Sequence, residues 1–263
     1  MKKRIVIGVV ATLVGISAVA AIVQRQSQPS PAVAMAQTSQ EKLTGVAATA
    51  LQQAMSEKKF LFLFVYGKDD EHRAQRKDFE AVMSKIDARW VAVNRDAPSE
   101  EAFAQKYRLL GTPTPLIIAI APNGALTGGF KEISEARCRK SMVSPGFQTC
   151  LKALQDQKLV LLCLQNQTTK HNEEAMRGVN EFKADAGYGA LTEIVRVDPA
   201  DPSEKSFLDR IRVSETIQEA TTILLSPPGS VLASFTGATS KKDFTDAIQR
   251  AVSSSSGSYN PRR

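Results

Sequence analysis

The sequence predicts an α/β protein of two tandem domains, each with a mixed central sheet flanked by helices. Two stretches repeat one sequence pattern: VAVNRDAPSEEAF from Val91 and VRVDPADPSEKSF from Val195, 104 residues apart. Both halves also place a helical pattern, a fully apolar run and a turn between two apolar runs in the same order. A repeat spaced by one domain length indicates an internal duplication, so the two copies should share one fold.

Each copy begins with a helix and a buried strand. Residues 43–59 and 147–158 place apolar side chains at three- and four-residue spacing, which is the helical period. The apolar runs FLFLFVY (60–66) and LVLLCLQ (159–165) follow them. Near-continuous apolarity without alternation is typical of a central strand that helices cover on both faces.

A polar turn, a second helix and a second strand come next in each copy. We expect the helices at about 73–86 and 172–184, and the strands at WVAV (90–93) and EIVRV (193–197). A strand-helix-strand crossover joins parallel strands, so the first two strands of each copy should pair in parallel.

The repeated Pro-Ser-Glu is predicted to open a third helix, followed by a hairpin and a last helix. Pro98 and Pro202 suit the first turn of a helix, where the missing amide costs nothing, and acidic residues are favoured beside the positive helix end. The turns at 123–124 and 228–229 each join two apolar runs, which predicts antiparallel strands at the edge of the sheet.

The first copy resembles the second half of thioredoxin-fold domains. The run VNRDAPSEEAFAQKYRLLGTPTPLIIAIAPNG (93–124) contains a strand ending in an amide, a helix with an aromatic near its end, Gly-x-Pro-Thr, a strand and an Asn-Gly turn in the family's order. The resemblance covers nearly all of residues 43–143 and implies two tandem thioredoxin-like domains. It places the family's cis-proline at Pro113 and leaves Pro115 as an extra proline.

The resemblance also implies a peptide-binding groove, because relatives hold extended peptides by backbone pairing beside the cis-proline. The predicted groove residues are Gly111, Thr112, Pro113 and Thr114. The second copy has Gln218 or a near neighbour at the proline position. Because cis bonds are essentially a proline phenomenon, we expect that loop to be built differently.

Redox-active relatives carry Cys-x-x-Cys between the first central strand and its helix. Here the corresponding turns read GKDDEHRAQ (67–75) and NQTTKHNEE (166–174), neither of which contains a cysteine. Disulfide exchange at the family's site is therefore excluded. The residues of these degenerate active-site turns that could still carry chemistry are Asp69, Asp70, Glu71, His72 and His171.

The two histidines of the chain, His72 and His171, lie 99 residues apart at matching positions. The acidic residues before His72 could supply metal ligands or a proton-transfer group. One histidine with adjacent carboxylates is not a metal-ligand spacing, however, and the dipole of a solvated helix start explains the acidic cluster. We therefore predict no catalytic residue, no metal and no cofactor.

The three cysteines lie elsewhere. Cys163 falls in an apolar strand and is predicted to be a small core residue. Cys138 and Cys150 flank the junction at 144–146. Two alternatives stay open for this pair: a disulfide between the domains, or two free, partly buried thiols.

The first 23 residues are predicted to export the rest of the chain. Lys2, Lys3 and Arg4 precede an uncharged stretch at 5–23, which fits either a bacterial signal peptide or a transmembrane anchor. The basic flank keeps the N-terminus in the cytoplasm, so the globular part is expected on the periplasmic or cell-surface side, anchored in the inner membrane if the stretch is retained.

Composition sets the other boundaries. Residues 24–40 are rich in Gln, Ser, Pro and Ala, which is typical of a flexible linker. The predicted domains span residues 41–143 and 144–252, and residues 253–263 (SSSSGSYNPRR) are typical of a disordered tail.

Charge and motifs together favour an interaction module. The formal net charge is +7, but four basic residues lie within the first 25 residues and the other charges are mixed along the chain, so we predict no nucleic-acid partner. We expect a non-enzymatic scaffold that binds a protein or peptide partner and contacts the membrane only through an uncleaved N-terminal helix. The alternative is a thiol-disulfide oxidoreductase or a metal-dependent enzyme that uses non-standard cysteine or histidine positions.

Overall fold

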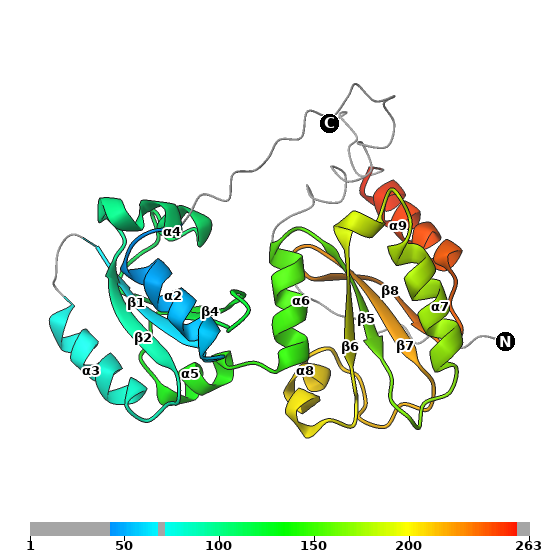
Figure 1. The fold of residues 1–263 in the computed structure, drawn as a ribbon, viewed down its shortest axis with the longest axis horizontal. Coiled ribbons are helices and arrows are strands. Elements are labelled where there is room, and N and C mark those ends of the chain that lie inside the picture. Colours follow the sequence, from blue (N-terminus) through cyan, green and yellow to red (C-terminus); the bar gives the residue numbers. More distant parts are fainter. Residues whose placement is uncertain (1–42, 68–71, 257–263) are drawn as a thin grey trace, which may run out of the picture. The chain divides into compact units, whose positions relative to one another are not determined.

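The computed structural model describes residues 43–67 and 72–256, which fall into two compact units (Figure 1). The first unit ends at Val143 and the second begins at Ser144. Within the described ranges, no helix combines the length and the apolarity that a membrane crossing requires.

Several predicted features lie outside the described residues and stay predictions. These are the leader (1–23), the linker (24–40), residues 257–263 of the tail, and Asp69, Asp70 and Glu71.

The first domain alternates helices and strands in the predicted order. Its elements are α2 (Val46–Ser56), β1 (Leu61–Tyr66), α3 (Arg73–Met83), β2 (Arg89–Asn94), the 3-10 turn η1 (Pro98–Glu100), α4 (Glu101–Lys106), β3 (Leu116–Ile120), β4 (Leu126–Phe130) and α5 (Glu135–Ser141). The strands form one mixed sheet in the order β2-β1-β3-β4. β1 is parallel to β2 and antiparallel to β3, so Val65 pairs with Val93 on one side and Leu116 on the other.

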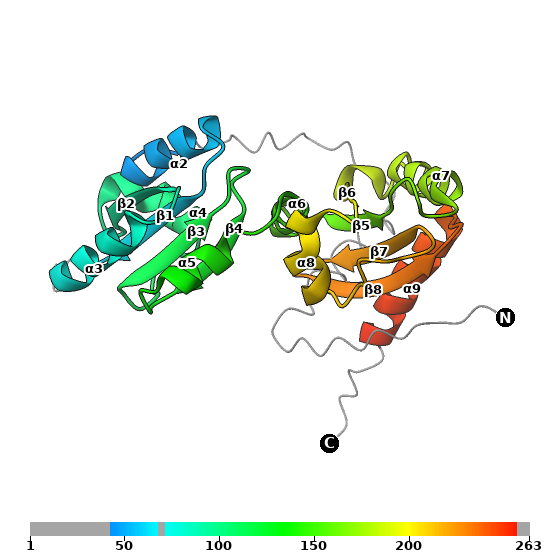
Figure 2. The same cartoon turned by 90° about the horizontal axis from the view of Figure 1, so that it is seen from below.

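Helices cover both faces of this sheet, as the continuous apolar run predicted. Successive strand residues point to opposite faces. Leu63 belongs to the buried cluster that contains residues of α2 and α4, whereas the ring of Phe64 lies 5.6 Å from that of Phe79 on α3. Figure 2 shows α2 on one side of the sheet and α3 and α5 on the other.

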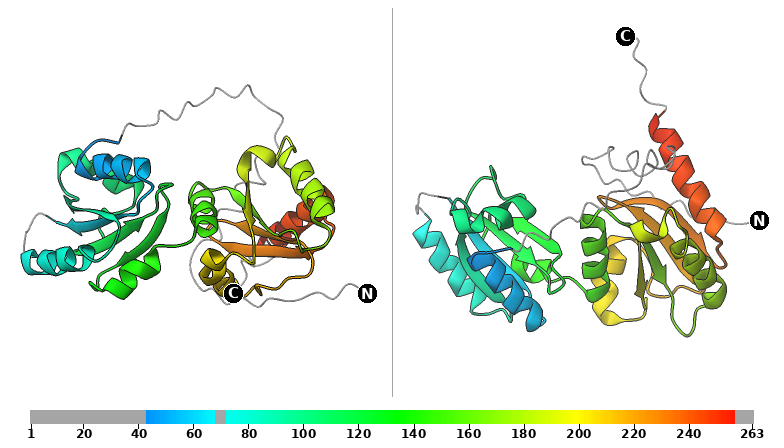
Figure 3. Two further views of the ribbon diagram at one scale, coloured as in Figure 1. Left: turned by 60° about the horizontal axis from the view of Figure 1, so that its bottom comes forward. Right: turned by 45° about the horizontal axis from the view of Figure 1, so that its top comes forward.

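The second domain repeats the arrangement. Its elements are α6 (Pro145–Gln155), β5 (Leu159–Leu164), α7 (Asn172–Lys183), the 3-10 turn η2 (Gly189–Leu191), β6 (Thr192–Val197), the 3-10 turn η3 (Pro202–Glu204), α8 (Lys205–Arg210), β7 (Thr221–Ser226), β8 (Ser230–Thr236) and α9 (Lys241–Ser256). The sheet order is β6-β5-β7-β8, with β5 parallel to β6 and antiparallel to β7. Helices α7 and α9 pack together on one face (Figure 3). The predicted α/β class, with two mixed sheets flanked by helices, is confirmed.

The repeated glutamate has the same structural role in both domains. Glu100 is 3% exposed, and its carboxylate accepts hydrogen bonds from the backbone N–H groups of Val46 and Ala47 at the start of α2. Glu204 is 5% exposed and accepts from the N–H of Gly146 at 2.7 Å, at the start of α6. We expected these acids to serve the helix that they precede in sequence. Instead each one caps the first helix of its domain.

Glycine leaves room for each buried carboxylate. Gly45 has φ +98°, and a Cβ built on it would lie 2.5 Å from Oε1 of Glu100. A Cβ on Gly146 would lie 2.9 Å from Oε1 of Glu204. A larger residue at either position would therefore displace the cap.

Two sequence predictions need correction. The cis peptide bond of the first domain joins Thr114 to Pro115, so the cis-proline is Pro115 and not Pro113. The physical reason is the strand register: Pro115 directly precedes β3, as Ala220 precedes β7. Helix α9 also continues to Ser256, past the predicted start of the tail at residue 253.

Candidate functional site

The first domain gathers three loops at one end of its sheet. Tyr66 pairs with Asn94 where β1 and β2 end, and Pro115 precedes the antiparallel β3 at the same end. A Cβ built on Gly67 would lie 3.3 Å from Oδ2 of Asp96 and 3.6 Å from Oγ1 of Thr114. The degenerate active-site turn therefore starts against the predicted groove.

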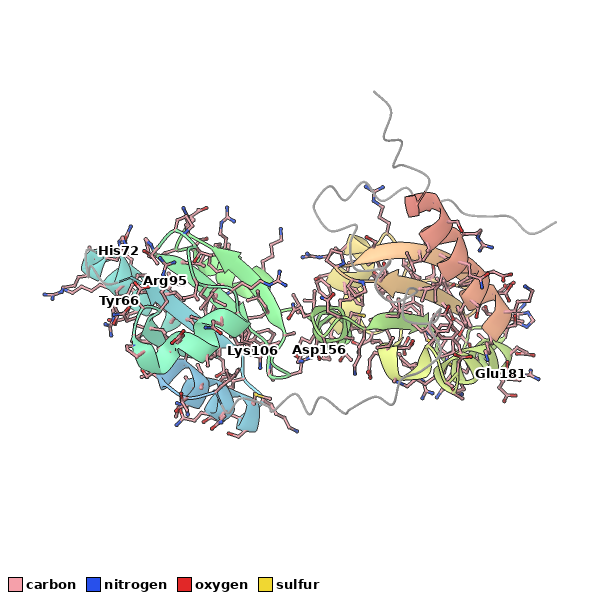
Figure 4. The ribbon with its side chains drawn as sticks, turned by 90° about the horizontal axis from the view of Figure 1, so that it is seen from above. Tyr66, His72, Arg95, Lys106, Asp156 and Glu181 are labelled. Atoms are coloured by element: carbon pink, nitrogen blue, oxygen red, sulfur yellow. The ribbon has the colours of Figure 1, made fainter. Side chains whose placement is uncertain are left out.

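Figure 4 shows Tyr66, His72 and Arg95 at this end of the first domain. His72 is half-buried and directly precedes α3. Of the predicted groove residues, Gly111 and Pro113 are exposed, and Thr112 and Thr114 are half-buried.

Arg95 holds the loop before the groove in place. Its Nη1 donates to the carbonyl of Leu109 at 3.1 Å, to Oγ1 of Thr112 at 3.0 Å and to the carbonyl of Thr112. Its side chain is 15% exposed, and Nε lies 3.7 Å from Oδ1 of Asp96. Hydrogen bonds from a charged donor are stronger than neutral ones, so this loop is preorganised. Sequence reasoning missed Arg95, because its only signal is a basic residue just after a strand.

The main-chain N–H and C=O of Thr114 have no hydrogen-bond partner within residues 43–67 and 72–256. The matching residue of the second domain, Glu219, also has no backbone partner among these residues, and its carbonyl accepts a bond from Oγ1 of Thr221 at 3.3 Å. Leu110, just upstream, is 48% exposed, which is unusual for a large apolar side chain in this part of the chain. Free backbone groups beside an exposed apolar residue are what an extended peptide can pair with.

In the second domain, the residues on either side of the matching position, Glu219, bond to the protein's own chain. The N–H of Lys170 donates to the carbonyl of Gln218 at 3.0 Å, and the N–H of Ala220 donates to the carbonyl of Lys170 at 2.9 Å. These bonds form a parallel bridge between Lys170 and Glu219. The prediction that this loop is built differently from the first copy is correct.

One residue difference excludes one of these two bonds from the first domain. Ala220 supplies an N–H, whereas its counterpart Pro115 has none and cannot donate. The second-domain turn is held further by its own side chains. The N–H of Asn166 donates to Oγ1 of Thr169 at 2.9 Å, and Nδ2 of Asn172 donates to the carbonyl of Asn166 at 2.6 Å.

The paired histidines occupy matching positions with different geometry. His72 has φ −101°, whereas the exposed His171 has a left-handed φ of 63°. Within residues 43–67 and 72–256, no three His, Cys, Asp or Glu side chains form a group that could hold a metal ion.

Cys138 and Cys150, for which a disulfide and two free thiols were the alternatives, lie in different domains. Both are free, buried thiols, and Cys150 packs inside the hydrophobic core of the second domain. A bridge would have to pull Cys150 out of this core. Cys163 is also free and buried in its strand, as expected of a core residue.

Burial also makes the thiols poor nucleophiles. It raises the pKa of Cys150 to about 12 and that of Cys163 to about 11, and it raises the pKa of Cys138 above its usual value. The thiolate is the reactive form of cysteine, so all three side chains are inert near neutral pH.

The two mixed sheets match the tandem thioredoxin-like domains that the resemblance implied. Comparisons with protein families and with curated proteins find no match. Several solved structures are similar, and they are thioredoxin-fold proteins.

Three of these structures illustrate the level of similarity. ERdj5 form II is 12% identical with a TM-score of 0.27, over 75% of this chain and 28% of that chain. Human ERp44 form I is 12% identical with a TM-score of 0.32, over 80% and 56%. The first two thioredoxin domains of Naumovozyma dairenensis Eps1p are 9% identical with a TM-score of 0.25, over 88% and 100%. The assignment of the fold rests on strand order and register and takes nothing from these scores.

Proposed function

We propose that this protein is a non-enzymatic interaction module whose first domain binds an extended segment of a protein or peptide partner beside Thr114. The second domain acts as scaffold, because its own chain bonds to the residues on either side of the matching position, Glu219. The observation that carries the proposal is a difference beside the groove: Ala220 donates its N–H to the carbonyl of Lys170, whereas Pro115 at the matching position has no N–H to donate.

The chemistry of the chain supports binding over catalysis. Neither active-site turn contains a cysteine, and all three thiols of the chain are buried with raised pKa values. A thiol-disulfide oxidoreductase needs an accessible thiolate, which these positions do not offer. No metal and no cofactor forms part of the proposal.

The proposal also includes export and tethering. Lys2, Lys3 and Arg4 followed by the uncharged stretch 5–23 support a globular part on the outer side of the inner membrane, held there if the leader is retained. The partner would then be an extracytoplasmic or membrane protein.

The test uses a photo-reactive amino acid at matched positions of the two domains. Placed at Pro113, which is exposed beside the open groove, it should crosslink the full-length protein to one defined partner in intact cells. Placed at Gln218, the residue 105 positions later, it should give no such product, because that loop is bridged to Lys170.

Arg95→Met provides the second arm of this experiment. The variant removes the hydrogen bonds to Leu109 and Thr112 and should weaken the Pro113 crosslink without changing the fold of the second domain. Equal crosslinking from both positions, or from Gln218 alone, would show that the groove of the first domain is not the binding site.

A further inference from the structure

The four edge strands of the two sheets differ in the features that oppose pairing with a strand of another chain. β2 carries Arg89 and β6 carries Glu193 and Arg196, and charges on an edge oppose pairing with another chain. β4 is short and contains the pair at 128–129, two glycines that weaken a strand. β8 has none of these devices: it is seven residues long, SVLASFT, with no charge, proline or glycine.

The neutrality extends beyond the strand itself. No charged residue occurs between Glu219 and Lys241. Charged residues usually flank strands that must not pair with a neighbour, and here they are missing over the whole β7-β8 hairpin.

The outer backbone of β8 is available for pairing. The N–H of Gly237 donates to the carbonyl of Ala220, so these two residues form a hydrogen-bonded pair of the antiparallel ladder. Because such pairs alternate along the ladder, Phe235 bonds towards β7, and the backbone groups of Ser234 and Thr236 point outward. Among the described residues, none bonds to these outward groups.

The strand also packs on one face and has exposed side chains elsewhere, and its ladder with β7 has a register shift between Leu224 and Leu225. On one face, the ring of Phe235 lies 5.1 Å from that of Phe244 on α9, which anchors the strand. Val231 is 42% exposed, and Ser234 and Thr236 are exposed. A neutral and exposed edge of this kind can pair with another strand.

We propose that β8 pairs in antiparallel fashion with β8 of a second copy of this chain, joining two second-domain sheets into one. The occupant follows from charge and length: a two-fold arrangement centred on Ser234 sets each neutral side chain against another neutral side chain, whereas β2 and β6 carry charges and the neutral β4 is shorter and contains two glycines. This interface is separate from the Thr114 groove, so a dimer would present two such grooves.

The experiment measures the mass of the full-length protein in a mild detergent by size-exclusion chromatography with light scattering. The wild-type protein should have the mass of a dimer. Ser234→Lys and Ser234→Glu each place two like charges directly opposite one another across the two-fold, and each should weaken self-association by about tenfold or more. An equimolar mixture of the two variants should recover the dimer, because opposite charges then face each other.

Gly129→Lys is the matched control on the edge strand of the first domain. A Cβ at Gly129 meets nothing closer than 3.7 Å, so the variant should fold and should keep the wild-type mass. The recovery by mixing separates loss of pairing from loss of folding. A wild-type monomer at all concentrations, an unchanged mass for Ser234→Lys, or no recovery in the mixture would each overturn the proposal.

Discussion

At the scale of single residues, one carboxylate in each copy joins two helices that are distant in sequence. Glu100 bonds to the start of α2, and Glu204 bonds to Gly146 and to the hydroxyl of Ser144 at the start of α6. Negative charge at a helix N-terminus is favourable, and burial strengthens the interaction. The repeated Pro-Ser-Glu motif is thus explained by the glutamate, which caps the first helix of each domain.

Removing this cap should destabilise the domain. Glu100→Ala leaves two backbone N–H groups near the start of α2 without an acceptor, and we expect the free energy of unfolding of the first domain to fall by about 3 kcal/mol. Urea unfolding followed by the fluorescence of Trp90, the single tryptophan, measures this domain. The control is Glu101→Ala, an exposed neighbour whose loss should change stability by about 0.5 kcal/mol or less. Equal effects would contradict a structural cap.

The buried thiols give a second prediction at this scale. At pH 7 to 8 the native protein should react with a thiol reagent far more slowly than the denatured protein, which should expose three thiols without reductant. Because burial raises the pKa of Cys150 to about 12 from 9.0, ionisation favours the unfolded chain above pH 9, and stability should fall as the pH rises from there. Fast native labelling, or fewer than three thiols after denaturation, would contradict this.

At the scale of elements, the strands could be predicted and the loop between α8 and β7 could not. The apolar runs at 60–66 and 159–165 predicted β1 and β5 closely, because a doubly covered strand leaves an uninterrupted apolar signature. The motif Gly-Thr-Pro-Thr predicted the cis-proline at Pro113. The structure has it at Pro115, because the start of β3 sets its position. The bridge of Lys170 to Glu219 depends on contact between segments about 50 residues apart, which no local pattern encodes.

The bridge itself can be opened by one substitution. Ala220→Pro removes the N–H that bonds to the carbonyl of Lys170, as proline does naturally at position 115. The amide of Lys170 should then exchange its hydrogen about fivefold faster, since one hydrogen bond contributes about 1 kcal/mol. Ala220→Gly keeps the N–H and serves as the control. Unchanged exchange in the proline variant would show that another contact holds the loop.

At the scale of the whole molecule, duplication kept the scaffold and changed what each copy exposes. Both copies share the sheet order, the glutamate cap and the hairpin. They differ at the loop before the third strand, where Pro115 replaces the N–H that Ala220 donates to Lys170, and at the last strand, where one edge contains two glycines and the other contains none. Sequence alone predicted the shared parts, because repetition makes them visible, but not these differences in exposed backbone.

The glutamate cap decides how the protein can be divided. Each cap joins the beginning of a domain to a residue more than fifty positions later, so no fragment that starts after Ser144 and no fragment that ends before Glu204 can form a complete second domain. The smallest fragment that could fold alone or be fused to another protein as a complete domain therefore contains both ends of this contact. The cap thus explains why the repeat unit is a whole domain.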